Sequence, residues 1–295
     1  MRYRPRSICT NRWVGSLAKA DSEAESSGVP ISEAFELAML SDVGTNRSNN
    51  EDSCGHLVET PDAVVFAVAD GVGGYEGGEV ASKMAIEITI EAYRDSPREW
   101  GASKRLHRAV QRANIEVYNF ASTVPELRRM ATTLTAVAIE NGTLNAAHIG
   151  DCRLYLLRAG KVTQMSKDHT MVGERVRMGL LSEARAKTHP DRSALLRSLG
   201  RELIVSVDRI TMPLRKGDEL ILCSDGLYNV IEDDELMTLT REFSAEDACK
   251  KLIRNANDRG TGDNLTVAFF KQLAATSEAE APSGLLGRLK NLFSR

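Results

Sequence analysis

The sequence predicts an α+β fold in which two mostly antiparallel sheets are flanked by helices. Three observations support this prediction: a wholly apolar run at residues 63–69, two amphipathic helical patterns after it, and two consecutive hairpin signals after the helices. Consecutive hairpins indicate an antiparallel meander, because parallel strands would need long crossover connections between them. The expected elements therefore form two sheets covered by helices.

The first expected elements are two strands and a pair of helices. Residues 35–40 form a strand pattern, and residues 63–69 form a buried strand that stops at an Asp-Gly pair. The segments 78–94 and 103–120 then carry apolar residues at spacings of about four, which is typical of amphipathic helices.

Two hairpins follow these helices. The first joins residues 132–140 to 143–149 through an Asn-Gly pair, which suits a type I′ turn. The second joins residues 153–157 to 161–165 through an Ala-Gly pair. Residues 166–200 have weak periodicity and many charges, so we expect an irregular or helical insert over the sheet. The remaining expected elements are strands at 203–207, 218–223 and 265–270, and a helix from Ser244 to about residue 257.

The chain has 295 residues, which allows one large domain or two small ones. We expect a flexible N-terminal extension over residues 1–33, one folded domain over 34–273 and a tail over 274–295. No apolar stretch is long enough for a secretory signal or a transmembrane helix, so neither is expected.

Composition narrows the classes of function. Hydrophobic residues make up 42% and charged residues 27%, which is typical of a globular chain. The net charge of −3 argues against nucleic-acid binding through bulk phosphate attraction. The five cysteines are scattered and form no C-x-x-C pair, so a reducing, cytoplasmic location is expected.

The end of the tail has an amphipathic pattern. Its apolar residues share one helical face and its basic residues lie elsewhere, which predicts weak docking to anionic lipid or to a partner protein. A helix packed on its own domain or a frayed end is the alternative. The residues are Leu285, Leu286, Leu289, Leu292 and Phe293, with Arg288, Lys290 and Arg295.

Carboxylates at strand ends are the most informative feature. Each alone could be an ordinary turn residue. If they gather on one rim, two charges 4 Å apart repel by about 4 kcal/mol at an effective dielectric of 20, so the group needs bound cations. All-oxygen ligands favour Mg²⁺ or Mn²⁺ over zinc. The residues are Glu51, Asp52, Asp70, Asp151, Asp225 and Asp263.

Two neighbouring features fit phosphate chemistry at a metal. The loop after Asp70 is rich in glycine, which lets backbone carbonyls and substrate approach an ion, but it lacks the pattern of a nucleotide-binding P-loop. Arg47 precedes the acidic pair by a few residues, and a guanidinium can bind two phosphate oxygens at once.

These motifs resemble the metal-dependent protein phosphatases of the PP2C (PPM) family in their bacterial serine/threonine form. The resemblance spans about residues 35–273, with the matching segments in family order. The segments are residues 41–52, 65–74, 131–139, 146–162, 166–170, 220–227 and 260–267.

The resemblance implies a four-layer α-β-β-α sandwich with two Mn²⁺ or Mg²⁺ ions, and a third in some bacterial members. It implies that Asp70 bridges two ions, that the Gly71 carbonyl binds one of them, and that Asp225 and Asp263 bind the other. It further implies that Glu51 and Asp52 hold or orient water at the metals. Asp151 and Asp225 would form the third site.

The resemblance also implies that Arg47 binds the substrate phosphate and that residues 166–200 are the flap linked to substrate choice. Animal and plant members often have a histidine two residues after the bridging aspartate. Val72 occupies that position here, as is common in bacterial members, so the proton for the leaving group must come from another source.

The expected function is hydrolysis of phosphoserine and phosphothreonine in proteins by a metal-activated water, without a phosphoenzyme. The expected partners are phosphorylated proteins, including a Ser/Thr kinase of the same cell and its substrates. Two alternatives remain: a regulatory pseudophosphatase that binds phosphoproteins without cleaving them, and a small-molecule phosphohydrolase.

Overall fold

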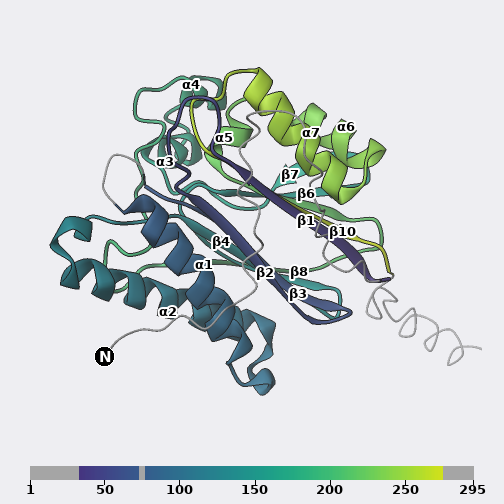
Figure 1. The fold of residues 1–295 in the computed structure, drawn as a ribbon. Helices are drawn as coiled ribbons and strands as arrows, with labels where there is room; N and C mark the ends of the chain where they lie inside the picture. The colour runs from purple at the N-terminus through teal and green to yellow at the C-terminus, as the bar shows by residue number, and fades with distance from the viewer. Residues whose placement is uncertain (1–32, 73–76, 275–295) are drawn as a thin grey trace, which may run out of the picture.

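Two five-stranded antiparallel sheets pack face to face in the computed structural model, which describes residues 33–72 and 77–274 (Figure 1). The first sheet has the order β1-β10-β9-β6-β7 and the second has the order β2-β3-β4-β5-β8. The strands are β1 (Phe35–Asp42), β2 (Asp52–Thr60), β3 (Ala63–Asp70), β4 (Leu134–Glu140), β5 (Thr143–Ile149), β6 (Arg153–Arg158), β7 (Lys161–Gln164), β8 (Asp208–Pro213), β9 (Glu219–Cys223) and β10 (Leu265–Gln272).

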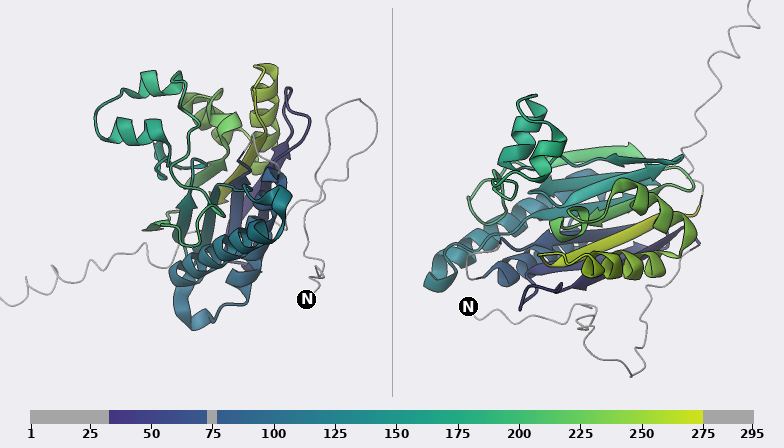
Figure 2. Two further views of the ribbon diagram at one scale, coloured as in Figure 1. Left: turned by 90° about the vertical axis from the view of Figure 1, so that its left-hand side faces the viewer. Right: turned by 90° about the horizontal axis from the view of Figure 1, so that it is seen from above.

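Helices cover the outer face of each sheet, so the predicted four-layer sandwich is confirmed (Figures 1 and 2). The pair α1 and α2 packs on the second sheet, and the pair α6 and α7 packs on the first. Short helical turns occupy the connections. The helical elements are α1 (Gly78–Arg94), η1 (Arg98–Trp100), α2 (Gly101–Thr123), η2 (Pro125–Leu127), α3 (Met171–Arg177), α4 (Glu183–Lys187), α5 (Asp225–Tyr228), α6 (Asp233–Glu242) and α7 (Ala245–Asp258).

The central core lies between the sheets. Phe270 stacks on Phe35 and on Phe66, with ring centroids 5.4 and 6.0 Å apart, so the two sheets meet through an aromatic cluster. Two outer cores join the helices to the sheets, and many of their helical residues are alanines, which allow close approach of a helix to a sheet. Burial on both faces explains why β3 is an unbroken apolar run.

Local sequence signals correctly placed several elements. The helix predicted over residues 78–94 is α1, and the Ser244 hydroxyl caps α7 by accepting a hydrogen bond from the Asp247 amide. Asn141 and Gly142 both have positive φ angles, 51° and 67°, as a type I′ turn requires. The β4–β5 and β6–β7 hairpins are therefore confirmed.

The strand predicted at residues 203–207 is wrong, because this segment forms no ladder. Its carbonyls bond to α2 instead: Asn114 donates to the Glu202 and Leu203 oxygens, and Gln111 donates to the Val205 oxygen. The strand of this region is β8, a few residues later, at the edge of the second sheet.

Strand β2 and helix α6 were not anticipated. In β2, Gly55 interrupts the apolar pattern, and a Cβ at that position would lie 2.7 Å from the Ile86 side chain of α1. The glycine is therefore needed for the approach of α1 to the sheet, although by itself it weakens the strand pattern.

Residues 166–200 contain α3 and α4, which project from one end of the sandwich (Figure 2). The isolated bridge Thr132–Leu199 ties the return of this segment to the domain, and the bridge Thr170–Leu195 closes the segment on itself. Apart from Glu33 and Ala274, the expected N-terminal extension and C-terminal tail, with its amphipathic pattern, lie outside the described residues. Within the described ranges, no helix is both long and apolar enough to cross a membrane.

Candidate metal centre

The predicted acidic residues come together at one end of the two sheets. Asp52 begins β2 directly opposite Asp70, the last residue of β3. Directly opposed residues of an antiparallel pair have Cβ atoms about 4.5–5.5 Å apart, and like charges in that arrangement are destabilising. The register of this one hairpin therefore already places two carboxylates side by side.

The first sheet and the connection between the sheets bring three more aspartates to the same end. Asp225 begins α5 just after β9, Asp263 precedes β10, and Asp151 lies between β5 and β6. The charges of these groups act on one another: Asp225 and Asp263 raise the pKa of Asp52, and Asp225 raises the pKa of Asp151. The five aspartates thus form one acidic cluster.

Burial raises the pKa values of the clustered aspartates. It raises the pKa of Asp52 to about 7, with the charges of Asp225 and Asp263 adding to this effect. Burial and Asp263 raise the pKa of Asp225 to about 6. For Asp70 and Asp151, burial followed by the neighbouring carboxylates raises the pKa well above its usual value. Binding of cations would remove this repulsion.

The donor set fits hard divalent cations. Carboxylate and carbonyl oxygens suit Mg²⁺ or Mn²⁺, and such ions usually use one or two carboxylates and retain several waters. Within residues 33–72 and 77–274, no three His, Cys, Asp or Glu side chains are placed to hold one ion by themselves. Ions of this kind would take their remaining ligands from a backbone carbonyl and water.

Gly71 provides a backbone oxygen beside Asp70. No backbone N–H of the described residues donates to its carbonyl, whereas its own N–H donates to the Glu51 carbonyl at 3.0 Å. A Cβ on Gly71 would lie 2.6 Å from the Gly78 backbone and 2.7 Å from the Glu51 oxygen. Only glycine fits this approach of three segments.

The Glu51 carboxylate lies at the start of α1. A Cβ on Gly78 would contact that carboxylate at about 3 Å, so the acid packs on the first residue of the helix. Positive charge at a helix N-terminus favours a carboxylate there. Burial nevertheless raises the pKa of Glu51, which the cation Arg47 partly offsets.

Two positioning residues were missed in the sequence. Ser224 donates a hydrogen bond from its hydroxyl to the Asp52 carboxylate at 2.6 Å and thereby links the two sheets. The Asn264 side chain accepts from the Glu51 N–H and donates to the Val43 and Asn49 carbonyls, at 2.9 Å in each case. For Asn264, the position directly after Asp263 was the only feature of the sequence that pointed to a role in the site.

Arg47 reaches the cluster from the loop between β1 and β2. Its Nη2 donates to Asp263 at 2.9 Å, and its side chain is 42% exposed. A guanidinium has five N–H donors, so this contact leaves donors for a phosphate group.

The buried histidines are packing residues. His148 is bonded at both ring nitrogens, to Thr135 and to the Lys167 carbonyl, and burial lowers its pKa to about 4. His169 lies between the Gly150 N–H and Asp208. Cys152 and Cys223 are fully buried, as expected for packing residues, and burial raises the pKa of the Cys223 thiol to about 12. Neither thiol is an activated nucleophile.

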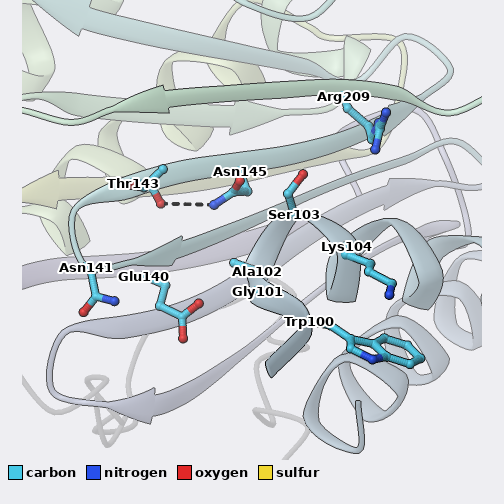
Figure 3. Close-up of a pocket in the computed structure, with 10 residues that line it drawn as sticks. All are labelled: Trp100, Gly101, Ala102, Ser103, Lys104, Glu140, Asn141, Thr143, Asn145 and Arg209. Atoms are coloured by element: carbon cyan, nitrogen blue, oxygen red, sulfur yellow. Dashed lines mark hydrogen bonds between the residues drawn. The ribbon is translucent and has the colours of Figure 1, made fainter. Parts of the chain in front are cut away.

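A wider hollow of about 450 Å³ lies elsewhere (Figure 3). It is lined by the start of α2 and by the β4–β5 hairpin turn, including Trp100, Lys104 and Asn141. Strand β4 begins near the cluster, because the Thr133 N–H, just before Leu134, donates to the Asp70 carbonyl. The hairpin turn is at the other end of β4. This hollow is therefore separate from the acidic cluster, and size alone does not identify the site.

The raised pKa values predict an unusual dependence of stability on pH. The folded metal-free chain holds protons on Asp52 and Asp225 up to about pH 7 and 6, whereas their ordinary pKa is 3.8. The metal-free protein should therefore lose stability as pH rises from about 4 to 7, by about 1.4 kcal/mol per pH unit for each proton difference.

Mn²⁺ should reverse this loss, because it replaces the protons. Thermal melts in chelator and in Mn²⁺ at pH 5 and pH 7.5 would test this, with a larger rise in Tm from Mn²⁺ expected at pH 7.5. A metal-free Tm that rises steadily over this range would contradict the assignment of a buried acid cluster.

Comparisons with known proteins bear on the family and the fold of the chain. A family model described as protein phosphatase 2C matches residues 44–269. The serine/threonine phosphatase stp of Listeria monocytogenes is 34% identical over 235 residues, covering 78% of this chain and 93% of the relative.

Solved structures of serine/threonine phosphatases are also similar to this chain. The serine/threonine phosphatase PstP/Ppp of Mycobacterium tuberculosis is 33% identical with a TM-score of 0.74, over 82% of this chain and 100% of that chain. The catalytic domain of PstP in complex with two manganese ions is 32% identical with a TM-score of 0.72, over 82% of this chain and 99% of that chain.

Proposed function

The chain belongs to the protein phosphatase 2C family, and we propose that its acidic cluster holds the metal ions with which it hydrolyses phosphoserine and phosphothreonine in proteins. It is a metal-dependent protein serine/threonine phosphatase that uses manganese or magnesium. The observation that carries the site assignment is the convergence of five aspartates from both sheets at one end of the sandwich.

The proposed ligands divide between the sheets. Asp70 and the Gly71 carbonyl would hold metal from the second sheet, and Asp225 and Asp263 would hold it from the first. Asp151, with Asp225, would serve a third ion. When bound, the metal pair supplies a low-pKa water and stabilises charge on the phosphoryl oxygens.

The remaining side chains orient the reactants. Glu51 and Asp52 accept hydrogen bonds from water in the site, and the Ser224 hydroxyl fixes the Asp52 carboxylate. Arg47 neutralises the phosphoryl oxygens as charge develops on them. Val72 has no proton to give, and His148 and His169 are bonded elsewhere, so the proton for the leaving alkoxide comes from water.

An assay with three substrates tests the function. With Mn²⁺, we expect turnover of p-nitrophenyl phosphate and a higher kcat/KM for a phosphothreonine peptide. Binding of the peptide without turnover would instead indicate a pseudophosphatase. A higher kcat/KM for phosphorylated metabolites would indicate a small-molecule phosphohydrolase.

The substrates are phosphorylated proteins. We further propose that they include a Ser/Thr kinase of the same cell and the substrates of that kinase, and that the protein acts in the cytoplasm. Docking of the C-terminal residues 284–295 to anionic lipid or to a partner protein also remains a proposal. It rests on the amphipathic pattern of that segment. If deletion of residues 284–295 leaves binding to anionic vesicles and to partner proteins unchanged, the docking proposal is wrong.

A further inference from the structure

A second, basic cavity lies next to the acidic cluster. It has a volume of about 140 Å³ and is lined by three arginines, Arg128, Arg129 and Arg201, together with Val72 and Met130. Among the residues that the structure describes, no acidic side chain lines it. A protein cavity of roughly 150 Å³ holds a benzene molecule, so this one has room for a carboxylate or a phosphate group.

One wall of the cavity is close to the acidic cluster. Val72, one of its walls, follows Asp70 by two residues, and the Val72 N–H donates to the Ala131 carbonyl at 3.0 Å. A chain extends at most about 3.6 Å per residue, so the Cα atoms of Val72 and Asp70 are within about 7 Å. An extended peptide covers this distance in about two residues.

Hydrogen bonds and packing hold two backbone segments of the cavity wall in place. The buried Asn114 of α2 accepts a hydrogen bond from the Gly200 N–H at 2.9 Å and donates to the Glu202 and Leu203 carbonyls, which brackets Arg201. Gly200 has a φ angle of 89°, and a Cβ there would lie 2.5 Å from Val117. On the other wall, Met130 is only 1% exposed and anchors the neighbouring arginines.

Two of the three arginines, Arg128 and Arg201, can offer their charge to a ligand. Arg128 and Arg201 are exposed, and neither forms an ion pair with an acidic residue of the described ranges. Guanidinium groups bind carboxylate and phosphate oxygens in pairs of parallel hydrogen bonds. Such a group of arginines, held on a fixed frame, is suited to one anionic side chain.

We propose that this cavity binds a second anionic side chain of the same substrate, one to three residues from the phosphoserine or phosphothreonine that is hydrolysed. This inference rests on the proposed function. The anion is a carboxylate or a second phosphate, and both share the chemistry that arginine recognises. The cavity admits one group, which suits a peptide side chain better than the repeating phosphates of a nucleic acid.

A peptide series tests the proposal. One phosphothreonine peptide has neutral flanks, others carry a single glutamate or a single phosphoserine at positions from −3 to +3, and kcat/KM is measured with Mn²⁺. At one or more positions we expect the anionic residue to raise kcat/KM at least tenfold, mainly through KM. Phosphoserine should exceed glutamate if a phosphate is the preferred ligand.

The variant pair Arg128→Gln/Arg201→Gln should reduce this ratio between anionic and neutral peptides to below two. The matched control Arg94→Gln/Arg112→Gln removes the same charge from two other exposed arginines and should leave the ratio unchanged. The proposal is overturned if the unmodified protein has the same kcat/KM for anionic and neutral peptides. It is also overturned if the Arg128/Arg201 variant keeps the ratio of the unmodified protein. Absence of turnover of every phosphopeptide would overturn the proposed function instead.

Discussion

Asp70→Ala is expected to abolish Mn²⁺-dependent hydrolysis of a phosphothreonine peptide, with kcat/KM falling by about 10³-fold or more. Asp70 is proposed as a ligand of the metal ions, and it faces Asp52 across the β2–β3 hairpin. Asp225→Asn should have an effect of similar size, because it removes a ligand from the other sheet. Steady-state kinetics with the peptide and calorimetric titration with Mn²⁺ would measure both losses.

The control for these variants is Asp62→Asn, in the turn at the far end of the same hairpin. It removes one carboxylate from β2–β3 without touching the cluster, so activity and Mn²⁺ affinity should stay within twofold. Near-normal turnover in Asp70→Ala or Asp225→Asn would remove the metal assignment.

Arg47→Ala should weaken use of the substrate far more than binding of the metal. Loss of charged hydrogen bonds to a phosphate corresponds to about 1.5–3 kcal/mol, or roughly a 10- to 100-fold fall in kcat/KM. Mn²⁺ affinity should change by less than about threefold, because Arg47 contributes no metal-binding atom. The same kinetic and calorimetric measurements separate the two effects.

Arg94→Ala is a matched control for this variant. Both arginines are about half exposed, 47% for Arg94 and 42% for Arg47, and each donates to one aspartate at 2.9 Å. Arg94 ends α1, away from the cluster, so its loss should leave kcat/KM unchanged. If Arg47→Ala loses Mn²⁺ binding while its affinity for the peptide stays the same, its assignment to the phosphate is wrong.

Signals within a few residues predicted much of the fold. The apolar run before Asp70, the Asn-Gly turn and the Ser244 cap each depend on neighbours in the chain, and each element forms as expected. Strand β8 and the segment 203–207 were misplaced, because hydrogen bonds from α2 to that segment decide where the ladder begins. Strand β2 was missed because Gly55 interrupts its apolar pattern; the glycine leaves room for the Ile86 side chain of α1.

The candidate site shows the same division. The acids that follow apolar strands could be predicted from the sequence, since a buried strand that ends in Asp is visible in its own residues. Three contacts appear only in the folded chain: Ser224 supports Asp52, Asn264 holds the loop beside Arg47, and Arg128 and Arg201 share a cavity. Such contacts join residues far apart in the chain, and the order of the strands in the sheets, which local periodicity does not encode, brings them together.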